Sequence, residues 1–349
     1  MLQRIDESMS ADDERVQALQ LVAEEWLERF RPTGEFRVAL LFRASVVAST
    51  CVALTGSKGA ERVEFDLCII DEASKATPTE LMVPMANARQ WVLVGDEKQL
   101  PPFLDSALVD ADFLAERELT RAEVDERLFT ELGTGLPAQS VAVLSHQHRM
   151  HPAIGKVVSD VFYGGELRSS AREVSPLVQR ALGGAVIWRD TGRKESERRS
   201  GLSYENRAEA RTVAELVGSI DNYEVLLGLD EVEVAVIAGY AAQVRTLQEV
   251  LSSTKSKLKV VRVKAATIDS YQGQEADICI VSLTRSNRRG DVGFLGSPER
   301  LNVAISRARD GLVIVGNRAM ADGSGDRRRS RKLAEVARAI AAAGGRNGR

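Results

Sequence analysis

The sequence predicts an α/β fold in which helices cover parallel strands. Apolar runs too short for a helix occur at 67–70 and 91–94, and each is closed by glycine or acidic residues. Such runs are typical of strands that are buried on both faces of a parallel sheet. Segments 104–139 and 206–220 are helix-compatible and can connect strands of this kind. The predicted fold class is therefore α/β with parallel sheets.

Length and composition limit the classes of protein to which the chain can belong. Its 349 residues are enough for two domains, and 44% hydrophobic with 5% aromatic residues is ordinary for a soluble α/β protein. Cys51, Cys68 and Cys279 are far apart, so they show neither a zinc spacing nor a disulfide framework. No run of roughly 18 apolar residues is present, so we expect no membrane span and a cytoplasmic protein.

The net charge of −3 is unevenly distributed along the chain. Residues 317–349 contain nine Arg or Lys against three Asp or Glu. A basic end of this kind either contacts phosphates or is a solvated tail. We expect residues 319–349 to form a solvated basic tail.

The N-terminal segment is predicted to be a helix without a chemical role. Residues 1–35 are helix-compatible, Ser10 to Asp13 resemble a capping box, and Pro32 to Gly34 would end the helix. Apolar residues at helical spacing predict that it packs against a neighbour; they are Val16, Leu19, Ala23, Trp26 and Phe30.

Carboxylates follow two of the predicted strands. Asp71 and Glu72 come directly after the first apolar run, and Gly95-Asp96 closes the second. Ligands of open parallel sheets bind beyond the carboxyl ends of the strands, so we expect these acids to converge on one crevice. Mg²⁺ is commonly held by one or two carboxylates together with phosphate oxygens.

The residue types at this edge suggest separate roles. We expect Asp71 to bind the metal, directly or through water, and Glu72 to orient and activate an attacking water. Gln99 follows the second strand and could sense a terminal phosphate. The alternative for the Asp71–Glu72 pair is a cap at a helix N-terminus, where negative charge is favoured. The Gly-Asp-x-x-Gln-Leu-Pro-Pro ending of the second strand favours the metal site.

Two motifs resemble those of superfamily 1 helicases. Ile70-Asp71-Glu72-Ala73-Ser74 resembles motif II, and Gly95 to Pro102 resembles motif III of the up-frameshift-type branch, which unwinds DNA or RNA 5′ to 3′. The resemblance runs from about residue 45 to about residue 318 and implies two RecA-like domains, 1–145 and 146–318. It also implies ATP and Mg²⁺ as cofactors, nucleotide binding at Asp96, and single-stranded DNA or RNA as partner.

The P-loop of this superfamily has no counterpart in the sequence. Thr55 to Gly59 contains Gly, Ser and Lys but does not match G-x-x-x-x-G-K-[ST], and we predict a surface turn there. We therefore expect the first RecA-like domain to be incomplete at its N-terminal side. The chain would then be a piece of a longer helicase, a partner of another polypeptide that supplies the P-loop, or a degenerate protein.

Ser145 to Pro152 follows a strand predicted at 141–144 and resembles motif IV. Arg149 matches the arginine that reaches the γ-phosphate, and a guanidinium suits this role because it is always charged and binds phosphate bidentately. His148 stands where the family has an aromatic residue that stacks on adenine. The three histidines of this stretch fit neither one helix face nor a zinc pattern, so we do not expect them to bind a metal.

The second domain is expected to contain strands at 232–238, 259–264, 278–283 and 312–316, with a charged loop at 189–199. Residues 266–277 resemble motif V. Gln272 and Gly273 would let the backbone approach a phosphate, because glycine adds no side chain. Glu275 matches the acid that contacts the sugar of the nucleotide.

Residues 299–309 resemble motif VI. Arg307 matches the second arginine of the nucleotide cleft. If this segment is helical, Arg309 points in another direction, so we assign the phosphate contact to Arg307.

The resemblance also implies contacts with the nucleic-acid backbone. A strand predicted at 46–51 ends in two hydroxyls, a Tyr-x-x-Gln element follows strand 232–238, and motif V supplies two further hydroxyls. Ordinary turn chemistry is the alternative for the first two of these features. The implied contact residues are Ser49, Thr50, Tyr240, Gln243, Thr267 and Ser270.

Two functions follow from these motifs. The first is an ATP-dependent helicase or translocase. ATP hydrolysis in a cleft between the domains would move the strand contacts of one domain relative to those of the other. The second is a non-catalytic nucleic-acid-binding or scaffold protein with a degenerate helicase fold. The catalytic residue set favours the first, and the missing P-loop favours the second. The choice between DNA and RNA stays open.

Overall fold

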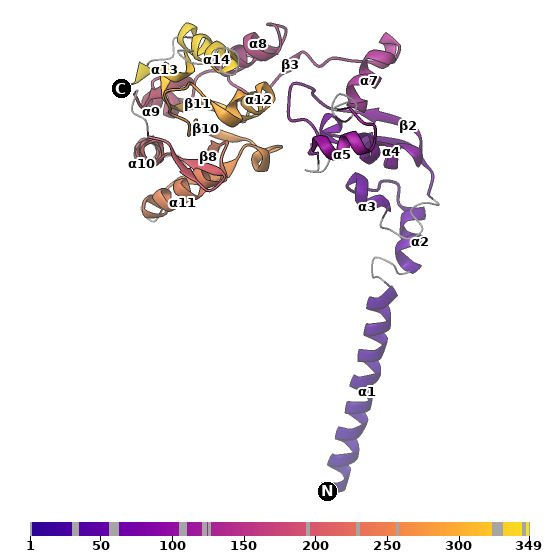
Figure 1. Ribbon diagram of the computed structural model, residues 1–349. Coiled ribbons are helices and arrows are strands. Elements are labelled where there is room, and N and C mark those ends of the chain that lie inside the picture. Colours follow the sequence, from indigo (N-terminus) through magenta and orange to yellow (C-terminus); the bar gives the residue numbers. More distant parts are fainter. Residues whose placement is uncertain are drawn as a thin grey trace. The chain divides into compact units, whose positions relative to one another are not determined.

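The computed structural model describes residues 2–29, 35–55, 63–104, 110–120, 124, 127–192, 196–227, 231–255, 258–322, 331–343 and 347–348. Two compact units make up the chain (Figure 1). The first consists of Met1–Asp96 with Pro101–Leu136, and the second of Glu97–Leu100 with Pro137–Arg349. Apart from the short segment Glu97–Leu100, the second unit begins at Pro137, ahead of the predicted boundary at 145–146.

The first unit combines a pair of strands with helices and short turns. Its strands are β1 (Phe65–Ile70) and β2 (Ala88–Leu93). Its helical segments are α1 (Leu2–Arg29), α2 (Glu35–Arg43), α3 (Cys51–Thr55), the 3₁₀ turn η2 (Ala73–Lys75), α4 (Pro78–Ala86), α5 (Ala111–Glu116) and α7 (Leu128–Gly135).

Strands β1 and β2 pair in parallel, as predicted, with Ile70 opposite Leu93. Helix α4 begins at a capping box, in which Thr77 N donates to Glu80 Oε2 at 2.8 Å and Glu80 N donates to Thr77 Oγ1 at 3.4 Å. The helix packs against one face of the strand pair. Ile70 and Leu81 belong to the small core that this packing creates.

The prediction that both faces of these strands are buried is wrong. Leu67, Ile69 and Val92 are 48%, 66% and 45% exposed. Successive side chains of a strand point to opposite faces, so these three share the face that α4 does not cover. Within the described residues, β1 and β2 thus form a parallel pair with one open apolar face, which is unusual because parallel sheets are normally covered on both sides.

Helix α1 also differs from its prediction. It runs from Leu2 to Arg29 through Ser10, so the predicted capping box at Ser10 is wrong. Val16, Leu19 and Trp26 are 52%, 64% and 54% exposed, so the predicted packing of this face is not found in the described chain. Phe30 and the predicted helix end at 32–34 lie outside the described residues, as does most of the turn predicted at 55–59.

The strands predicted at 46–51 and 141–144 are wrong. Residues 46–50 have no regular structure, and Thr50 Oγ1 instead accepts a hydrogen bond from Ala53 N at 3.3 Å in the first turn of α3. Residues 141–145 are irregular as well, and Val143 and Leu144 are each 83% exposed. Both segments have strand-like composition, but no described strand pairs with them.

The second unit is built on a six-stranded sheet in the order β12-β5-β11-β10-β8-β9. Every neighbouring pair in it is parallel. The strands are β5 (Val186–Asp190), β8 (Val232–Ala238), β9 (Val261–Thr267), β10 (Ala276–Ser282), β11 (Ala308–Gly316) and β12 (Asn347–Gly348). Four of these strands overlap the runs predicted at 232–238, 259–264, 278–283 and 312–316, so those predictions are confirmed.

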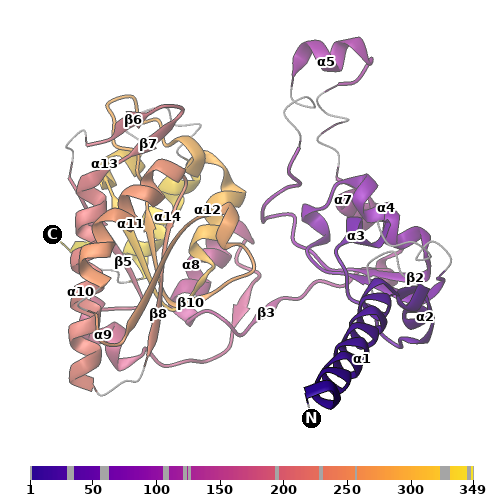
Figure 2. The same ribbon diagram turned by 90° about the horizontal axis from the view of Figure 1, so that it is seen from below.

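Helices cover both faces of this sheet (Figure 2). One face carries α9 (Pro176–Leu182), α10 (Arg207–Leu227) and α11 (Ala241–Lys255). The other carries α8 (Pro152–Phe162), α12 (Pro298–Ile305) and α14 (Arg331–Ala342). The helix predicted at 206–220 is confirmed as α10, and α14 shows that the predicted tail contains a packed helix.

Short elements complete the second unit. They are the pair β3 (His146–Gln147) and β4 (Arg168–Ser169), the antiparallel hairpin β6 (Arg198–Ser200) and β7 (Ser203–Glu205), helix α13 (Arg318–Ala321), and the 3₁₀ turns η4 (Ala138–Ser140), η5 (Asp269–Tyr271) and η6 (Gly293–Gly296). Of the segment predicted as a loop at 189–199, residues 189–190 belong to β5 and residues 198–199 to β6.

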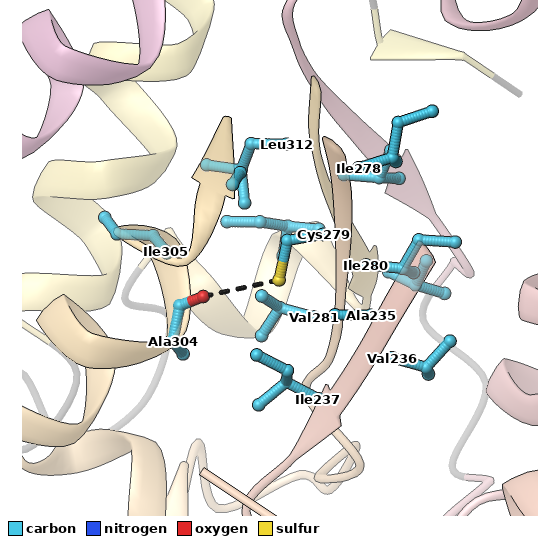
Figure 3. Packing of buried hydrophobic residues seen from close by; sticks show 14 of the residues in the cluster. Ala235, Val236, Ile237, Ile278, Cys279, Ile280, Val281, Ala304, Ile305 and Leu312 are labelled. Atoms are coloured by element: carbon cyan, nitrogen blue, oxygen red, sulfur yellow. Dashed lines mark hydrogen bonds between the residues drawn. The ribbon is translucent and has the colours of Figure 1, made fainter. Parts of the chain in front are cut away.

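The centre of the second unit is a core of aliphatic side chains (Figure 3). Ile278, Ile280 and Val281 on β10 are all 0% exposed. Cys279 lies among them, and its Sγ donates to the carbonyl of Ala304 at 3.5 Å. Cys279 is 0% exposed, so its thiol is a core residue, and this burial raises its pKa to about 12.

No helix in the described part of the chain is long and apolar enough to cross a membrane.

Replacing Ile280 by Ala should destabilise the second unit by about 2–5 kcal/mol, because the substitution leaves a cavity in a fully buried sheet. Urea unfolding followed by circular dichroism measures this loss. Leu202→Ala is the control, because Leu202 is 96% exposed and its truncation should change the free energy of unfolding by less than about 0.5 kcal/mol. Equal effects of the two substitutions would contradict the assignment of the core.

Candidate functional site

The carboxyl ends of β1 and β2 are joined by a set of short hydrogen bonds. Val94 N donates to Ile70 O at 2.8 Å, and Ala73 N donates to Val94 O at 2.8 Å. Beyond them, Ser74 Oγ donates to Asp96 O at 3.0 Å and accepts from Asp96 N at 3.1 Å. Motif II is therefore joined to the start of motif III, Gly95-Asp96, within the first unit.

Gly95 is required for this close approach. A Cβ atom added at Gly95 would lie 2.8 Å from Ser74 N, a backbone atom that cannot move aside easily. The glycine of motif III thus lets the two strand ends touch, so that the carboxylates of Asp71 and Asp96 follow neighbouring strands at the same edge.

Glu72 lies in a strained backbone conformation. Its φ of 54° and ψ of 34° are left-handed, a region that costs a residue with a side chain about 1–2 kcal/mol. Its side chain makes no capping hydrogen bond to the turn η2 that follows. This geometry disfavours the helix-cap alternative for Glu72, and strain of this kind is concentrated at functional sites.

Asp71 fits only part of a metal site. Among the described residues, no group of three or more His, Cys, Asp or Glu side chains could hold a metal ion. Mg²⁺ needs only one or two protein carboxylates when phosphate oxygens and water complete its ligands. The exposed carboxylate of Asp71 suits a site of that kind.

In the second unit, two of the residues that are predicted to bind the nucleotide form an ion pair with each other. Arg149 Nε donates to Glu275 Oε2, and both side chains are 38% exposed. Arg309 also reaches Glu275 at 3.5 Å and binds Asp277 at 2.9 Å. A partly exposed arginine and carboxylate are thus held together after β3 and before β10.

Arg307 is 3% exposed and lies in the turn between α12 and β11. Its Nη1 donates to Gln274 O at 3.3 Å, and its Nη2 donates to Gln99 Oε1 at 3.4 Å. Gln99 belongs to the segment Glu97–Leu100 that groups with the second unit. The premise that Arg307 and Arg309 lie on one helix is wrong, since α12 ends at Ile305 and Arg309 lies in β11.

Motif V forms an exposed turn after β9. Thr267 Oγ1 donates to Ser270 Oγ at 2.8 Å, and both hydroxyls lie at the surface. Gly273 has a φ of 76°, and nothing lies within 4 Å of the place where a Cβ would be. The backbone at Gly273 therefore has open space beside it.

The histidines after β3 make local contacts. His148 Nδ1 lies 2.7 Å from Ser170 Oγ, and the ring is exposed. His151 Nδ1 accepts a hydrogen bond from Ala153 N at 3.1 Å and so caps α8. Burial lowers the pKa of His151, which keeps the ring neutral for this role.

Burial argues against direct nucleic-acid contact by the Tyr-x-x-Gln element. Gln243 is 0% exposed, and its amide bonds both Asn206 N at 2.6 Å and Ser282 Oγ at 2.9 Å. Tyr240 is 4% exposed, and its hydroxyl accepts from Arg285 at 3.3 Å. In this conformation the two side chains make buried contacts within the protein and do not reach its surface. Ser49 and Thr50, by contrast, are exposed.

Glu209 belongs to this buried group and was missed by sequence reasoning. It is 0% exposed, and its Oε2 accepts from Ser282 Oγ at 2.6 Å and from Thr284 N at 2.7 Å. Burial raises the pKa of Glu209 to about 8. A signal was present, because Glu209 occupies the helical stripe that continues through Val213 and Val217, where only apolar residues are expected.

Two protein-family models, both described as AAA domain, match residues 2–107 and 124–319 of the chain. "ATP-dependent helicase upf1" of Schizosaccharomyces pombe is 32% identical over 291 residues, which are 80% of this chain and 29% of that protein. The chain belongs to the up-frameshift-like superfamily 1 helicases. The predicted resemblance is confirmed.

Further members of this helicase family match at similar levels. "Regulator of nonsense transcripts 1 homolog" of Neurospora crassa is 31% identical over 83% of this chain and 26% of its own length. "5'-3' DNA helicase ZGRF1" of Mus musculus is 32% identical over 80% of this chain and 14% of its own length. The chain thus spans about a quarter of the length of the first curated relatives that it matches.

A solved C-terminal domain of a possible DNA helicase from Lactobacillus is 15% identical and covers 54% of this chain and 94% of the solved one. Its TM-score of 0.32 is too low to bear on the fold of this helicase.

Glu72→Gly should be more stable than Glu72→Ala by roughly 1 kcal/mol, because both remove the carboxylate but only glycine relieves the left-handed backbone. Urea unfolding monitored for the first unit, with a tryptophan signal from Trp91, tests this difference. Equal stability of the two variants would show that position 72 carries no strain.

Glu209 should make stability depend on pH in a defined window. Its folded pKa of about 8 lies above the ordinary value of 4.5, so its contribution is full below pH 4.5 and is lost as pH rises through about 8. The slope for one proton is at most about 1.4 kcal/mol per pH unit. Urea midpoints across this range should fall for the native protein and fall less for Glu209→Gln. A parallel decline in both proteins would contradict this role of Glu209.

Proposed function

We propose that the chain is part of an ATP-dependent helicase or translocase that acts on single-stranded nucleic acid. The observation that carries this proposal is the joined edge of motifs II and III, where Asp71 and Glu72 follow β1 beside the end of β2. Residues with these roles at one sheet edge suit phosphoryl transfer, which depends on positioning and charge stabilisation.

Each catalytic residue has a distinct task in this proposal. Asp71 would bind Mg²⁺, which neutralises charge on the phosphates when it is bound. Glu72 would orient the attacking water and accept its proton. Gln99 would sense the terminal phosphate. Its hydrogen bond with Arg307 connects it directly to motif VI within the second unit.

The arginines would stabilise the charge that develops on the phosphoryl group. Arg149 and Arg307 are the proposed phosphate ligands, with Glu275 at the sugar of the nucleotide. The pair between Arg149 and Glu275 holds both side chains near the exposed turn of motif V, so a nucleotide can replace or share this interaction. Asp96, His148, Gln272 and Gly273 complete the proposed nucleotide contacts.

We propose that hydrolysis is coupled to movement along the strand, 5′ to 3′, through Ser49 and Thr50 in one unit and Thr267 and Ser270 in the other. Their exposed hydroxyls suit contacts with phosphates or sugars, which carry no sequence information. Relatives described as a regulator of nonsense transcripts and as a DNA helicase support nucleic acid as the substrate class, and they leave both DNA and RNA open.

The sequence contains no P-loop, and this bears on two further proposals. The first is that a longer polypeptide or a partner protein supplies the P-loop segment, and that the protein acts in the cytoplasm. The alternative function, a nucleic-acid-binding or scaffold protein without catalysis, is favoured by one observation, which is that no G-x-x-x-x-G-K-[ST] sequence is present.

Phosphate release by the purified chain tests these proposals. We expect almost no hydrolysis by this chain alone, with or without oligo(dT) or oligo(U), because no P-loop lysine is present. Adding a P-loop-containing segment from a relative should give strand-stimulated hydrolysis, and Glu72→Gln should reduce it by at least about 100-fold. If the completed protein binds nucleic acid but stays inactive, the scaffold alternative is correct.

A further inference from the structure

The loop that follows β10 in the second unit is held by a buried arginine. Arg285 is 5% exposed, and its guanidinium forms a bidentate ion pair with the carboxylate of Glu197. The Nε–Oε2 distance is 3.0 Å and the Nη2–Oε1 distance is 3.3 Å. It also donates to Asp291 Oδ2 at 3.0 Å, at the far end of the same loop. A buried bidentate pair of this kind is costly to desolvate and fixes geometry strongly.

The same carboxylate connects the loop to the hairpin β6–β7. Glu197, which precedes β6, accepts hydrogen bonds from Ser286 N at 2.7 Å and from Asn287 Nδ2 at 3.0 Å. Tyr204 on β7 lies under the Arg285 guanidinium at 4.1 Å. The hairpin and the loop therefore form one rigid assembly, which we call the Arg285 clamp (Glu197, Tyr204, Arg285 and Asp291).

The loop begins at a strained residue. Thr284 has a φ of 67°, which is unfavourable for a β-branched side chain. Its N donates to the buried Glu209 at 2.7 Å, and its carbonyl accepts from Asn206 Nδ2 at 3.1 Å. Strain that is fixed by buried polar groups persists where the surrounding structure specifies one conformation, and it commonly marks a functional loop.

The clamp presents arginines to solvent. Arg288 and Arg289 at the tip of the loop are exposed, as are Arg198 and Arg199 on β6. Arg198 follows Glu197 and Arg288 follows Asn287, so the hydrogen bond between Glu197 and Asn287 brings the bases of both arginine pairs together. Residues 197–205 and 285–291 contain five arginines against three carboxylates, whereas the chain as a whole has a net charge of −3.

The position of the clamp suits a strand-binding surface. Thr284 follows the carboxyl end of β10, and β10 pairs with β8, which in turn pairs with β9. Thr267 at the end of β9 and the clamp therefore belong to the same edge of the sheet, where parallel α/β proteins bind ligands. Figure 2 shows β6 and β7 at the same end of this unit as α13, which follows β11.

We propose that Arg288 and Arg289, fixed by the Arg285 clamp and supported by Arg198 and Arg199, bind the phosphodiester backbone of single-stranded nucleic acid. This site rests on the proposed function, since it assumes that the chain binds a strand, and it adds contacts outside the helicase motifs. A merely solvated loop would not need a buried ion pair, a strained threonine and a second hairpin to fix its tip. Two adjacent guanidinium groups match the repeated charge of phosphates.

The test is the salt dependence of strand binding by the full chain. Fluorescence anisotropy with labelled oligo(dT) and oligo(U) gives the association constant over a series of KCl concentrations. Each phosphate contact on a single strand contributes a slope of about −0.7 to log K against log[salt]. Arg288→Ala/Arg289→Ala should make the slope shallower by about 1.4 and weaken binding on the order of tenfold at low salt.

Two controls separate this site from net charge and from folding. Arg180→Ala/Arg338→Ala removes two exposed arginines from α9 and α14 and should leave the slope unchanged. Arg288→Lys/Arg289→Lys keeps both charges and should restore most of the slope. Urea unfolding should give the same midpoint for all three variants, because each changed side chain is exposed.

The outcomes distinguish the two proposals. If the native chain binds and the alanine pair behaves as the native chain does, the arginine site is refuted while the proposed function stands. An equal loss in the α9–α14 control also refutes the site, because the effect is then one of net charge. If the native chain binds neither oligonucleotide, strand binding by this chain is refuted, and the arginine site with it.

Discussion

The parallel register between neighbouring strands is the constraint on which both units depend. In the first unit it sets Ile70 beside Leu93, and in the second it sets Ser282 beside Ala238. Because all these strands point the same way, the residues that follow them collect at one edge of each sheet. In this way Asp71 and Asp96 meet after β1 and β2, whereas Glu275 and Arg307 precede β10 and β11 and meet at the amino ends of these strands.

At both edges the exposed polar groups rest on residues that are not exposed. In the first unit, the buried Ser74 bonds the backbone of Asp96 at the neighbouring strand end. In the second, the buried Glu209 and Gln243 both bond Ser282 at the end of β10. The chemistry of the surface groups is therefore set by a layer of buried polar contacts, which must all be satisfied for the edge to keep its shape.

The sequence predicts those parts of the structure that local patterns determine. Strands such as 232–238 and 278–283 are continuous apolar runs, and a run of this kind has few alternatives once helices flank it. Asp71 and Glu72 were found because adjacent acids after such a run are conspicuous. The strands predicted at 46–51 and 141–144 failed because a strand needs a partner, and composition does not say whether one is present. Gln243, Glu209 and Arg285 could not be placed because their roles depend on contacts with residues 37 to 88 positions away.

The open face of β1 and β2 has a consequence for the behaviour of this chain in solution. Leu67, Ile69 and Val92 form a flat, apolar surface on a strand pair whose outer edges have no described partner strand. Surfaces of this type attract one another, and unpaired edges can add strands from other molecules. Self-association through the first unit would then compete with correct folding of the chain, and the competition would grow with protein concentration and with temperature, since the hydrophobic attraction weakens on cooling.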